Sequence, residues 1–226
     1  MKYMMLLLVI LHSISTPAQP ILTNGKIVFE KKTNITRIDQ EEGRSFSHSN
    51  QPLQFSISYY ELLFTNSRSI YQPQKTGFRE ASPSWWNITS ENNTYTDFSR
   101  GIFLSRKKIF DLDLTVLDSI AHINWKISSD TRIICGILCR KATCILMDSL
   151  IIIAFYTDRI STTGGPESFT GLPGMILGLA IPKLHTTWYA TGIQQISSQE
   201  TLNISSIEAI EIYKKDRTNK VNAGQI

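Results

Sequence analysis

The stretch LIIIAFYT at residues 150–157 is the strongest indication of fold class in this chain. Residues 151–155 are all apolar and lack the polar alternation of a strand that has one face in water. A run of this kind is typical of a central strand covered on both faces, by a helix or by the curvature of its own sheet. Asp148 and Ser149 precede it, and a two-residue connection predicts a tight hairpin with a strand at 131–147, although neither residue is glycine.

Alternating apolar and polar residues predict further strands on both sides of this segment. The expected strands lie at residues 25–31, 53–64, 112–116, 125–127, 175–181 and 186–190. A polar turn is expected at 128–130. Residues 202–213 support one last strand, with a short helix as the alternative.

Two polar segments interrupt this series of strands. Residues 37–50 predict a loop or an irregular turn, and residues 66–100 predict a long loop that carries short strands. Aromatic residues interrupt the second segment, among them Trp85, Trp86, Tyr95 and Phe98. We interpret them as caps over an open edge of the core, with a ligand-facing rim as the alternative.

Composition favours a single domain. With 226 residues, of which 42% are hydrophobic, the chain is long enough for one core and short for two full domains. Its net charge of +4 is too weak a field to indicate a nucleic-acid partner, and none is expected. Residues 214–226 are polar and basic and predict a frayed tail beyond a domain that spans residues 19–213.

The first eighteen residues have the pattern of a secretory signal peptide. Lys2 supplies a positive charge, residues 4–11 are apolar, and Ala18 ends a small-residue motif suited to cleavage. A membrane anchor is the alternative, but a spanning helix needs about 20 apolar residues. We therefore expect residues 1–18 to be removed, and the mature protein to be exported and not to span a membrane.

Three cysteines, Cys135, Cys139 and Cys144, fall within ten positions, and their odd number leaves at least one thiol unpaired. Four residues of extended strand span about 13 Å, beyond the roughly 7 Å that a disulfide allows between Cα atoms. A pair therefore needs a bend, which a bulge at Gly136 would supply. Small buried side chains on strands are the preferred interpretation. Neither C-x-x-C nor H-E-x-x-H occurs, so no metal site and no cofactor are predicted.

The glycine-rich stretch at residues 164–174 does not encode a phosphate loop. Met175 and Ile176 follow Gly174 where a phosphate loop would place Lys and Ser or Thr, and G-x-G-x-x-G is absent. We expect Gly171 and Gly174 to adopt positive φ while Pro173 fixes its own backbone angle. The result is a stiff double turn that sets Phe169 and Leu172 against the core.

The hexapeptide GLPGMI at residues 171–176 resembles the signature of the GLPGLI family of exported bacterial proteins, with Met175 where that signature has Leu. The resemblance is strong over residues 120–189. It rests on motifs that stand in the family's order: Trp125-Lys126-Ile127, Asp130-Thr131, Gly136, Cys139-Arg140-Lys141-Ala142, Ala154-Phe155-Tyr156-Thr157, Gly165-Pro166 and Phe169. The sequence departs from the pattern at Ile137, where the family often has an aromatic residue, and at Cys135 and Cys144, which lie outside it.

This resemblance implies a β-rich exported protein of the periplasm or the outer cell envelope, in a family without a settled activity. Family members are often encoded beside TonB-dependent outer-membrane transport components, which suggests such a component as a partner. The expected fold is mainly β, a single curved antiparallel sheet that is half-barrel or sandwich-like, with few short helices.

The sequence does not favour an enzyme. G-x-S-x-G is absent, and the best residual nucleophile and base are Cys139 with His122 or His185. The leading hypothesis is a non-catalytic protein that binds an apolar ligand, a peptide or a transport partner on one face of its sheet. A secreted thiol-dependent hydrolase that uses Cys139 and a structural accessory of the envelope are the alternatives.

Ten residues are expected to shape the binding site or its scaffold. They are Trp125, Cys139, Tyr156, Gly165, Pro166, Phe169, Gly171, Leu172, Pro173 and Gly174.

Overall fold

The computed structural model of the chain describes residues 22–41, 43, 53–74, 93–109 and 112–197. The expected signal peptide at 1–18, the last strand at 202–213, the basic tail at 214–226, and Trp85 and Trp86 lie outside these residues. No helix in the described ranges is long and apolar enough to cross a membrane.

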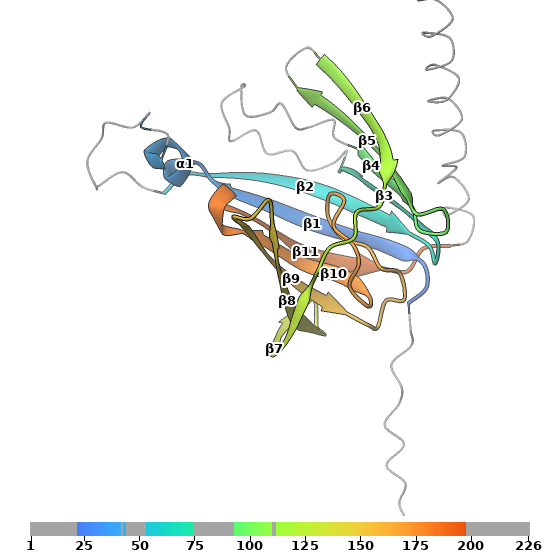
Figure 1. Cartoon of the computed structure of the whole chain (residues 1–226). Coiled ribbons are helices and arrows are strands. Elements are labelled where there is room, and N and C mark those ends of the chain that lie inside the picture. Colours follow the sequence, from blue (N-terminus) through green and yellow to red (C-terminus); the bar gives the residue numbers. More distant parts are fainter. Residues whose placement is uncertain (1–21, 42, 44–52, 75–92, 110–111, 198–226) are drawn as a thin grey trace, which may run out of the picture.

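The protein is mainly β and forms one antiparallel sheet of eleven strands (Figure 1). The strands are β1 (Gly25–Asn34), β2 (Phe55–Phe64), β3 (Arg68–Pro73), β4 (Asn93–Asp97), β5 (Ile102–Ile109), β6 (Leu112–Ser119), β7 (Lys126–Ile134), β8 (Ile137–Leu146), β9 (Leu150–Thr157), β10 (Met175–Ile181) and β11 (Thr186–Gln194). Their spatial order is β6-β5-β4-β3-β2-β1-β11-β10-β9-β8-β7, so β6 and β7 are the edge strands. One helix, α1 (Ile35–Glu41), and a 3₁₀ turn, Pro182–Leu184, complete the described elements.

The strands expected within the described residues are found, but several details of the sequence interpretation are wrong. Residues 131–147 do not form one strand, because β7 and β8 meet at Cys135 and Gly136. Both residues have positive φ, 50° and 75°, which is the geometry of a two-residue hairpin with a type I′ turn. A cysteine rarely occupies such a position, so composition concealed the turn.

The polar turn expected at 128–130 is also absent, since these residues continue β7 through a change of register between Ile127 and Thr131. The hairpin before the LIIIAFYT strand is confirmed, but its loop between Leu146 and Leu150 has three residues, 147–149, and not the two expected. Part of the loop expected at 37–50 is helical, since α1 occupies Ile35–Glu41.

The strand buried on both faces is β10, not β9. Residues 175–179 are all buried, whereas Ile151 of β9 is 49% exposed. Two different segments cover β10. They are the connection between β9 and β10, residues 158–174, and the β7–β8 hairpin.

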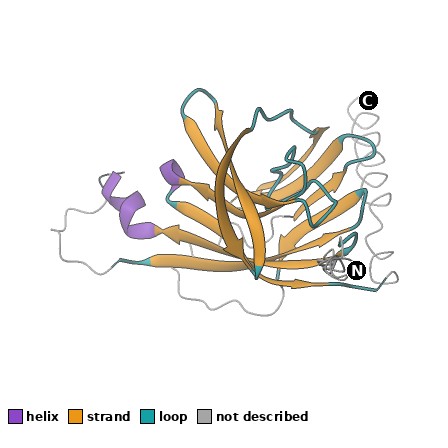
Figure 2. Ribbon diagram, turned by 90° about the horizontal axis from the view of Figure 1, so that it is seen from below, coloured by secondary structure: helices purple, strands orange, loops and turns teal. Residues whose placement is uncertain are grey.

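Trp188 and Tyr189 of β11 show which face each of these segments covers, because consecutive residues of a strand point to opposite sides. On the Trp188 side, Lys31 lies 5.1 Å from the indole ring and pairs at 3.7 Å with Glu167 of the β9–β10 connection. On the Tyr189 side, Arg132 of β7 donates a hydrogen bond of 2.6 Å to the tyrosine hydroxyl. The connection therefore lies inside the curve of the sheet, and the hairpin folds over the outside (Figure 2).

A glycine permits the close approach of the β7–β8 hairpin to β10. A Cβ on Gly178 would lie 2.9 Å from Cδ1 of Ile134 in the hairpin. On the inner side, Leu172 is 1% exposed and belongs to the main core with Phe29, Tyr60 and Ile176. Burial of one leucine side chain stabilises the fold by about 2 kcal/mol. The predicted packing of Leu172 against the core is confirmed.

The Gly/Pro corner, residues 171–174, has the backbone that the sequence predicts. Gly171 and Gly174 have φ of 92° and 138°. The N–H of Gly174 donates to the carbonyl of Leu172 at 2.8 Å. A Cβ on Gly174 would overlap the backbone carbonyl oxygen of Thr157, so no side chain fits where the corner meets the end of β9.

Replacement of Gly174 by alanine should therefore lower the free energy of unfolding by at least about 2 kcal/mol, because strain at positive φ adds to a backbone clash. Urea unfolding followed by circular dichroism measures the change. Gly192→Ala is the matched control, since Gly192 has no atom within 4 Å of its ideal Cβ. Equal stabilities for the two variants would contradict the packing described for this corner.

Candidate functional site

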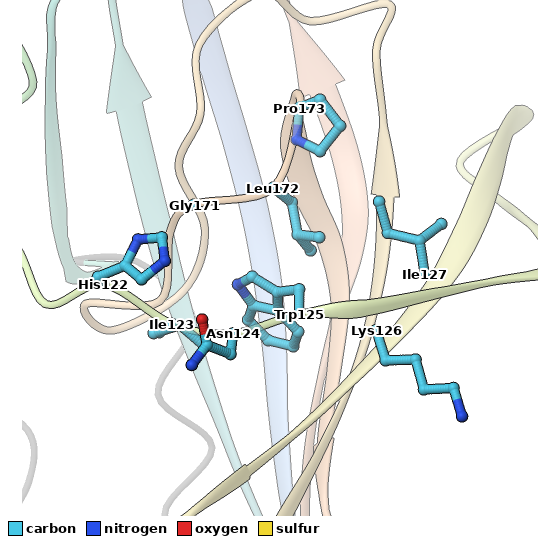
Figure 3. Close-up of a pocket in the computed structure, with 9 residues that line it drawn as sticks. All are labelled: His122, Ile123, Asn124, Trp125, Lys126, Ile127, Gly171, Leu172 and Pro173. Carbon is cyan, nitrogen blue, oxygen red and sulfur yellow. The ribbon is translucent and has the colours of Figure 1, made fainter.

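An open cleft of about 500 Å³ lies between the start of β7 and the Gly/Pro corner (Figure 3). Two short segments line it: His122, Ile123, Asn124, Trp125, Lys126 and Ile127 on one side, and Gly171, Leu172 and Pro173 on the other. We call it the Trp125 cleft. Its two walls are far apart in sequence but are joined by a side-chain contact.

Trp125 makes that contact. Its indole Nε1 donates a hydrogen bond of 2.9 Å to the backbone carbonyl of Thr170. The corner backbone passes close to the ring, since a Cβ on Gly171 would lie 3.6 Å from Nε1. The hydrogen bond satisfies the only polar atom of the indole. The half-buried ring is thereby fixed as a wall of the cleft, and its remaining surface is apolar.

The cleft combines apolar walls with polar groups near its ends. In Figure 3 Leu172 extends toward the indole, Pro173 lies beyond Leu172 at the corner, and Lys126 extends away from them. Ile127 is 41% exposed at the start of β7. Such a surface suits a ligand with apolar side groups and hydrogen-bonding capacity.

The structure brings together four of the ten residues expected at the site, Trp125, Gly171, Leu172 and Pro173. The other six do not line the cleft. They are Cys139, Tyr156, Gly165, Pro166, Phe169 and Gly174.

Several of these six residues pack into or against the main core instead. Gly165 packs against Ile176, where a Cβ would approach the isoleucine Cβ to 2.8 Å, and Phe169 is partly buried against the main core. Tyr156 is 1% exposed, and its hydroxyl has no hydrogen-bond partner among the described residues. They are scaffold positions.

Cys139 does not have the environment of a nucleophile. It is fully buried, and desolvation, with a smaller contribution from Cys135, raises the pKa of its thiol to about 11. All three cysteines are free, so the bend at Gly136 does not produce a disulfide.

Neither candidate base meets Cys139. His185 Nε2 lies 2.9 Å from the carboxylate of Glu41 in α1. Cys139 pairs with Arg132, whereas His122 lies before Lys126, and the strand from Lys126 to Arg132 alone spans about 20 Å. The described residues therefore do not assemble the thiol-imidazole pair on which the hydrolase alternative depends.

A second hollow of about 280 Å³ lies on the inner side of the sheet, between β4–β6 and the β9–β10 connection. Phe103, Leu114 and Val116 form its apolar wall, and Thr94, Ser105, Lys107, Glu167 and Ser168 supply polar groups. No sequence pattern marked this hollow as a site. The alternation at 112–116 placed Leu114 and Val116 on one face of a strand, but nothing in the sequence showed that the connection would lie opposite them.

Comparison with known proteins supports the fold and leaves the activity open. A family described as "Protein of unknown function (Porph_ging)" matches residues 146–178, a span that contains β9 and the Gly/Pro corner. No curated protein matches the chain.

Five chains of solved structures match. One structure of PNGF-II, in space group P21, aligns with a TM-score of 0.53 and 14% identity over 78% of this chain and 29% of that one. A second, in space group C2, gives 0.54 and 13% over 78% and 28%. At this identity the match concerns the fold alone, and this chain spans less than a third of the length of those structures.

Alkylation tests the inertness of Cys139. A thiol pKa of about 11 in place of 9.0 lowers the thiolate fraction at neutral pH about 100-fold. In a Cys135→Ser, Cys144→Ser variant, iodoacetamide should label Cys139 at least about 100-fold more slowly than a model thiol. The urea-unfolded variant is the control and should react at the model rate. Labelling of the folded protein as fast as the model thiol would revive the hydrolase alternative.

Proposed function

We propose that this chain is an exported, non-catalytic protein of the cell envelope that binds an extended apolar peptide segment in the Trp125 cleft. The observation that carries the proposal is that this cleft opens onto a sheet edge. β7 pairs only with β8 among the described strands, so its outer backbone groups are available to a further strand.

The hairpin geometry identifies which backbone groups these are. The closing pair of a two-residue hairpin, here Ile134 and Ile137, exchanges both hydrogen bonds. Bonded and non-bonded pairs then alternate, so the N–H and C=O of Ile133 and Thr131 point to the outside. A peptide from the cleft to Ile133 would run about 20 Å along β7, the length of about six residues.

The cleft would give such a peptide its side-chain selectivity. Backbone pairing along an edge is insensitive to sequence, whereas pockets for alternate side chains are selective. Trp125, Ile127 and Pro173 offer an apolar surface where the peptide enters. Since the indole is already fixed by Thr170, ordering it on binding costs little conformational entropy.

Location and partner rest on sequence rather than on geometry. The pattern of residues 1–18 supports export. The resemblance of residues 171–176 and their surroundings to the GLPGLI family supports the periplasm or outer envelope, and a TonB-dependent outer-membrane transport component as the source of the peptide. If the peptide belongs to a permanent assembly, the same contact makes this chain a structural accessory.

A small apolar ligand is the second candidate. The specific observation that favours it is the inner hollow, where Leu114 and Val116 are 46% and 50% exposed opposite the β9–β10 connection. This ligand would occupy a different part of the molecule from the peptide, so the two candidates can be separated by mutation.

Peptide binding is tested by isothermal titration with a library of eight-residue peptides rich in apolar residues. Trp125→Ala should weaken the best peptide about 30-fold, the equivalent of about 2 kcal/mol for an aromatic anchor. Thr131→Pro should weaken it as well, because proline removes the outward N–H. Leu184→Ala, at an exposed apolar position outside the cleft, is the control and should bind normally.

The same peptide with N-methylated backbone amides should lose affinity for the unmodified protein. The cleft proposal would be refuted if no peptide of the library binds. It would also be refuted if the best peptide binds every variant with the same affinity as the unmodified protein. Ligand binding that depends on Leu114 and Val116 instead would move the function to the inner hollow.

A further inference from the structure

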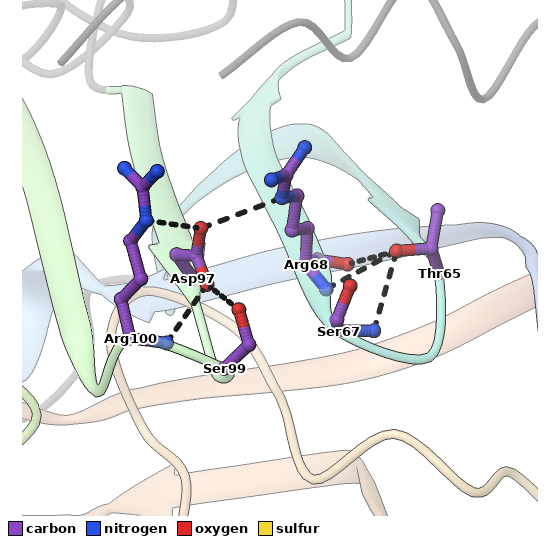
Figure 4. Close-up of polar contacts among 6 residues, drawn as sticks. All are labelled: Thr65, Ser67, Arg68, Asp97, Ser99 and Arg100. Atoms are coloured by element: carbon purple, nitrogen blue, oxygen red, sulfur yellow. Dashed lines mark hydrogen bonds and ion pairs between the residues drawn. The ribbon is translucent and has the colours of Figure 1, made fainter. Parts of the chain in front are cut away.

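Two arginines share one buried carboxylate at the turns that join β3, β4 and β5 (Figure 4). Asp97, the last residue of β4, is 1% exposed and stands opposite Arg68 in the register of β3 and β4. Arg100 follows in the turn to β5. This cluster shares no residue with the Trp125 cleft or the inner hollow.

The two oxygens of Asp97 have different partners. Oδ1 accepts hydrogen bonds from the Ser99 hydroxyl at 2.5 Å and from the backbone N–H of Arg100 at 3.0 Å. Oδ2 lies 3.4 Å from Nε of Arg68 and 4.0 Å from Nε of Arg100. Asp97 thus fixes the turn with one oxygen and positions both guanidinium groups with the other.

Each guanidinium group approaches Asp97 through Nε, and its terminal nitrogens point away from the carboxylate, to the same side of the cluster (Figure 4). Asp97 is the only ion-pair partner of Arg68 and Arg100 within the part of the chain that the structure describes. Their side chains are 30% and 49% exposed, so solvent and ligands can reach them.

The charges of the cluster do not cancel. Burial favours the neutral form of Asp97, but hydrogen bonds from Ser99 and Arg100 and the charge of both arginines outweigh it and lower the pKa of the carboxyl. Asp97 is therefore ionised at neutral pH, and two guanidinium charges against one carboxylate leave a net charge of about +1. A structural ion pair needs only one arginine, and the second leaves an excess positive charge.

We propose that Arg68 and Arg100 form a binding site for a phosphate-type oxyanion, either free or as the phosphate monoester of a larger molecule. Both Nε atoms lie within 4.0 Å of one oxygen. This shared partner places the two guanidinium groups side by side, and an oxyanion with several oxygens accepts charge-assisted hydrogen bonds of about 2.8 Å from more than one donor.

A phosphate fits this arrangement better than a carboxylate does. A carboxylate has two oxygens and is satisfied by one guanidinium fork, whereas a phosphate monoester offers three oxygens and up to two negative charges at neutral pH. The proposal does not depend on the proposed peptide binding, because the cluster shares no residue with the Trp125 cleft.

The test measures binding of inorganic phosphate and of vesicles to the full chain. Phosphate is titrated by calorimetry, and vesicles of phosphatidylcholine with 20% phosphatidic acid, which presents a phosphate monoester, are tested by co-sedimentation. Arg100→Gln should weaken binding of at least one probe tenfold or more. Arg68→Lys, which keeps the charge and loses the planar fork, should weaken it several-fold. Arg37→Gln, at an exposed arginine of α1, is the control and should have no effect.

The two probes distinguish the source of the phosphate. Binding of inorganic phosphate that competes with vesicles indicates a free anion, and binding of vesicles alone indicates a membrane-borne headgroup. The proposal is overturned if neither probe binds, or if Arg37→Gln weakens binding as much as Arg100→Gln does. Circular dichroism of each variant shows that a loss of binding is not a loss of fold.

Discussion

The structure depends on the burial of the β9–β10 connection inside the curve of the sheet. An eleven-stranded sheet has two faces, and the inner face carries large apolar side chains such as Phe29, Tyr60 and Trp188. The connection covers that face with Leu172 and enters it through close backbone approaches. Gly174 admits it against the carbonyl of Thr157, and no residue with a Cβ fits there. The hydrophobic effect drives this burial, but steric fit determines which residues can make the corner.

The Trp125 cleft is a consequence of that burial. Leu172 belongs to the main core and also lines the cleft, so the wall of the cleft is held by the same contacts that stabilise the fold. The hydrogen bond from Trp125 to Thr170 then ties the chain that enters β7 to the corner. A site held in this way is preorganised, because the free protein already has its walls in place. The glycines and the buried Leu172 of residues 165–174 are explained by this packing.

Sequence patterns predicted the strands and turns that depend only on neighbouring residues. The apolar run of β9, the alternating strands and the positive φ of Gly171 and Gly174 all follow from side-chain period or backbone freedom within a few residues. The Cys135–Gly136 hairpin was missed because a cysteine at positive φ is rare, so the composition of the turn gave no signal. Only part of the cleft was predicted, since the approach of Trp125 to Thr170 joins segments 45 residues apart. The inner hollow and the Asp97 cluster also depend on contacts between segments that are distant in sequence, so no local pattern predicts them.

The two proposed binding sites share no residue, but the β9–β10 connection contacts both of them. Thr162 of the connection donates a hydrogen bond of 2.6 Å to the carbonyl of Thr65, beside the turn that carries Arg68, and Thr170 accepts the hydrogen bond from Trp125. Coupling between the sites would therefore pass through this connection. Leu172 of the connection is buried in the main core, which opposes such a movement. A protein of this design can hold one ligand at Arg68 and Arg100 while its opposite edge remains available to a peptide.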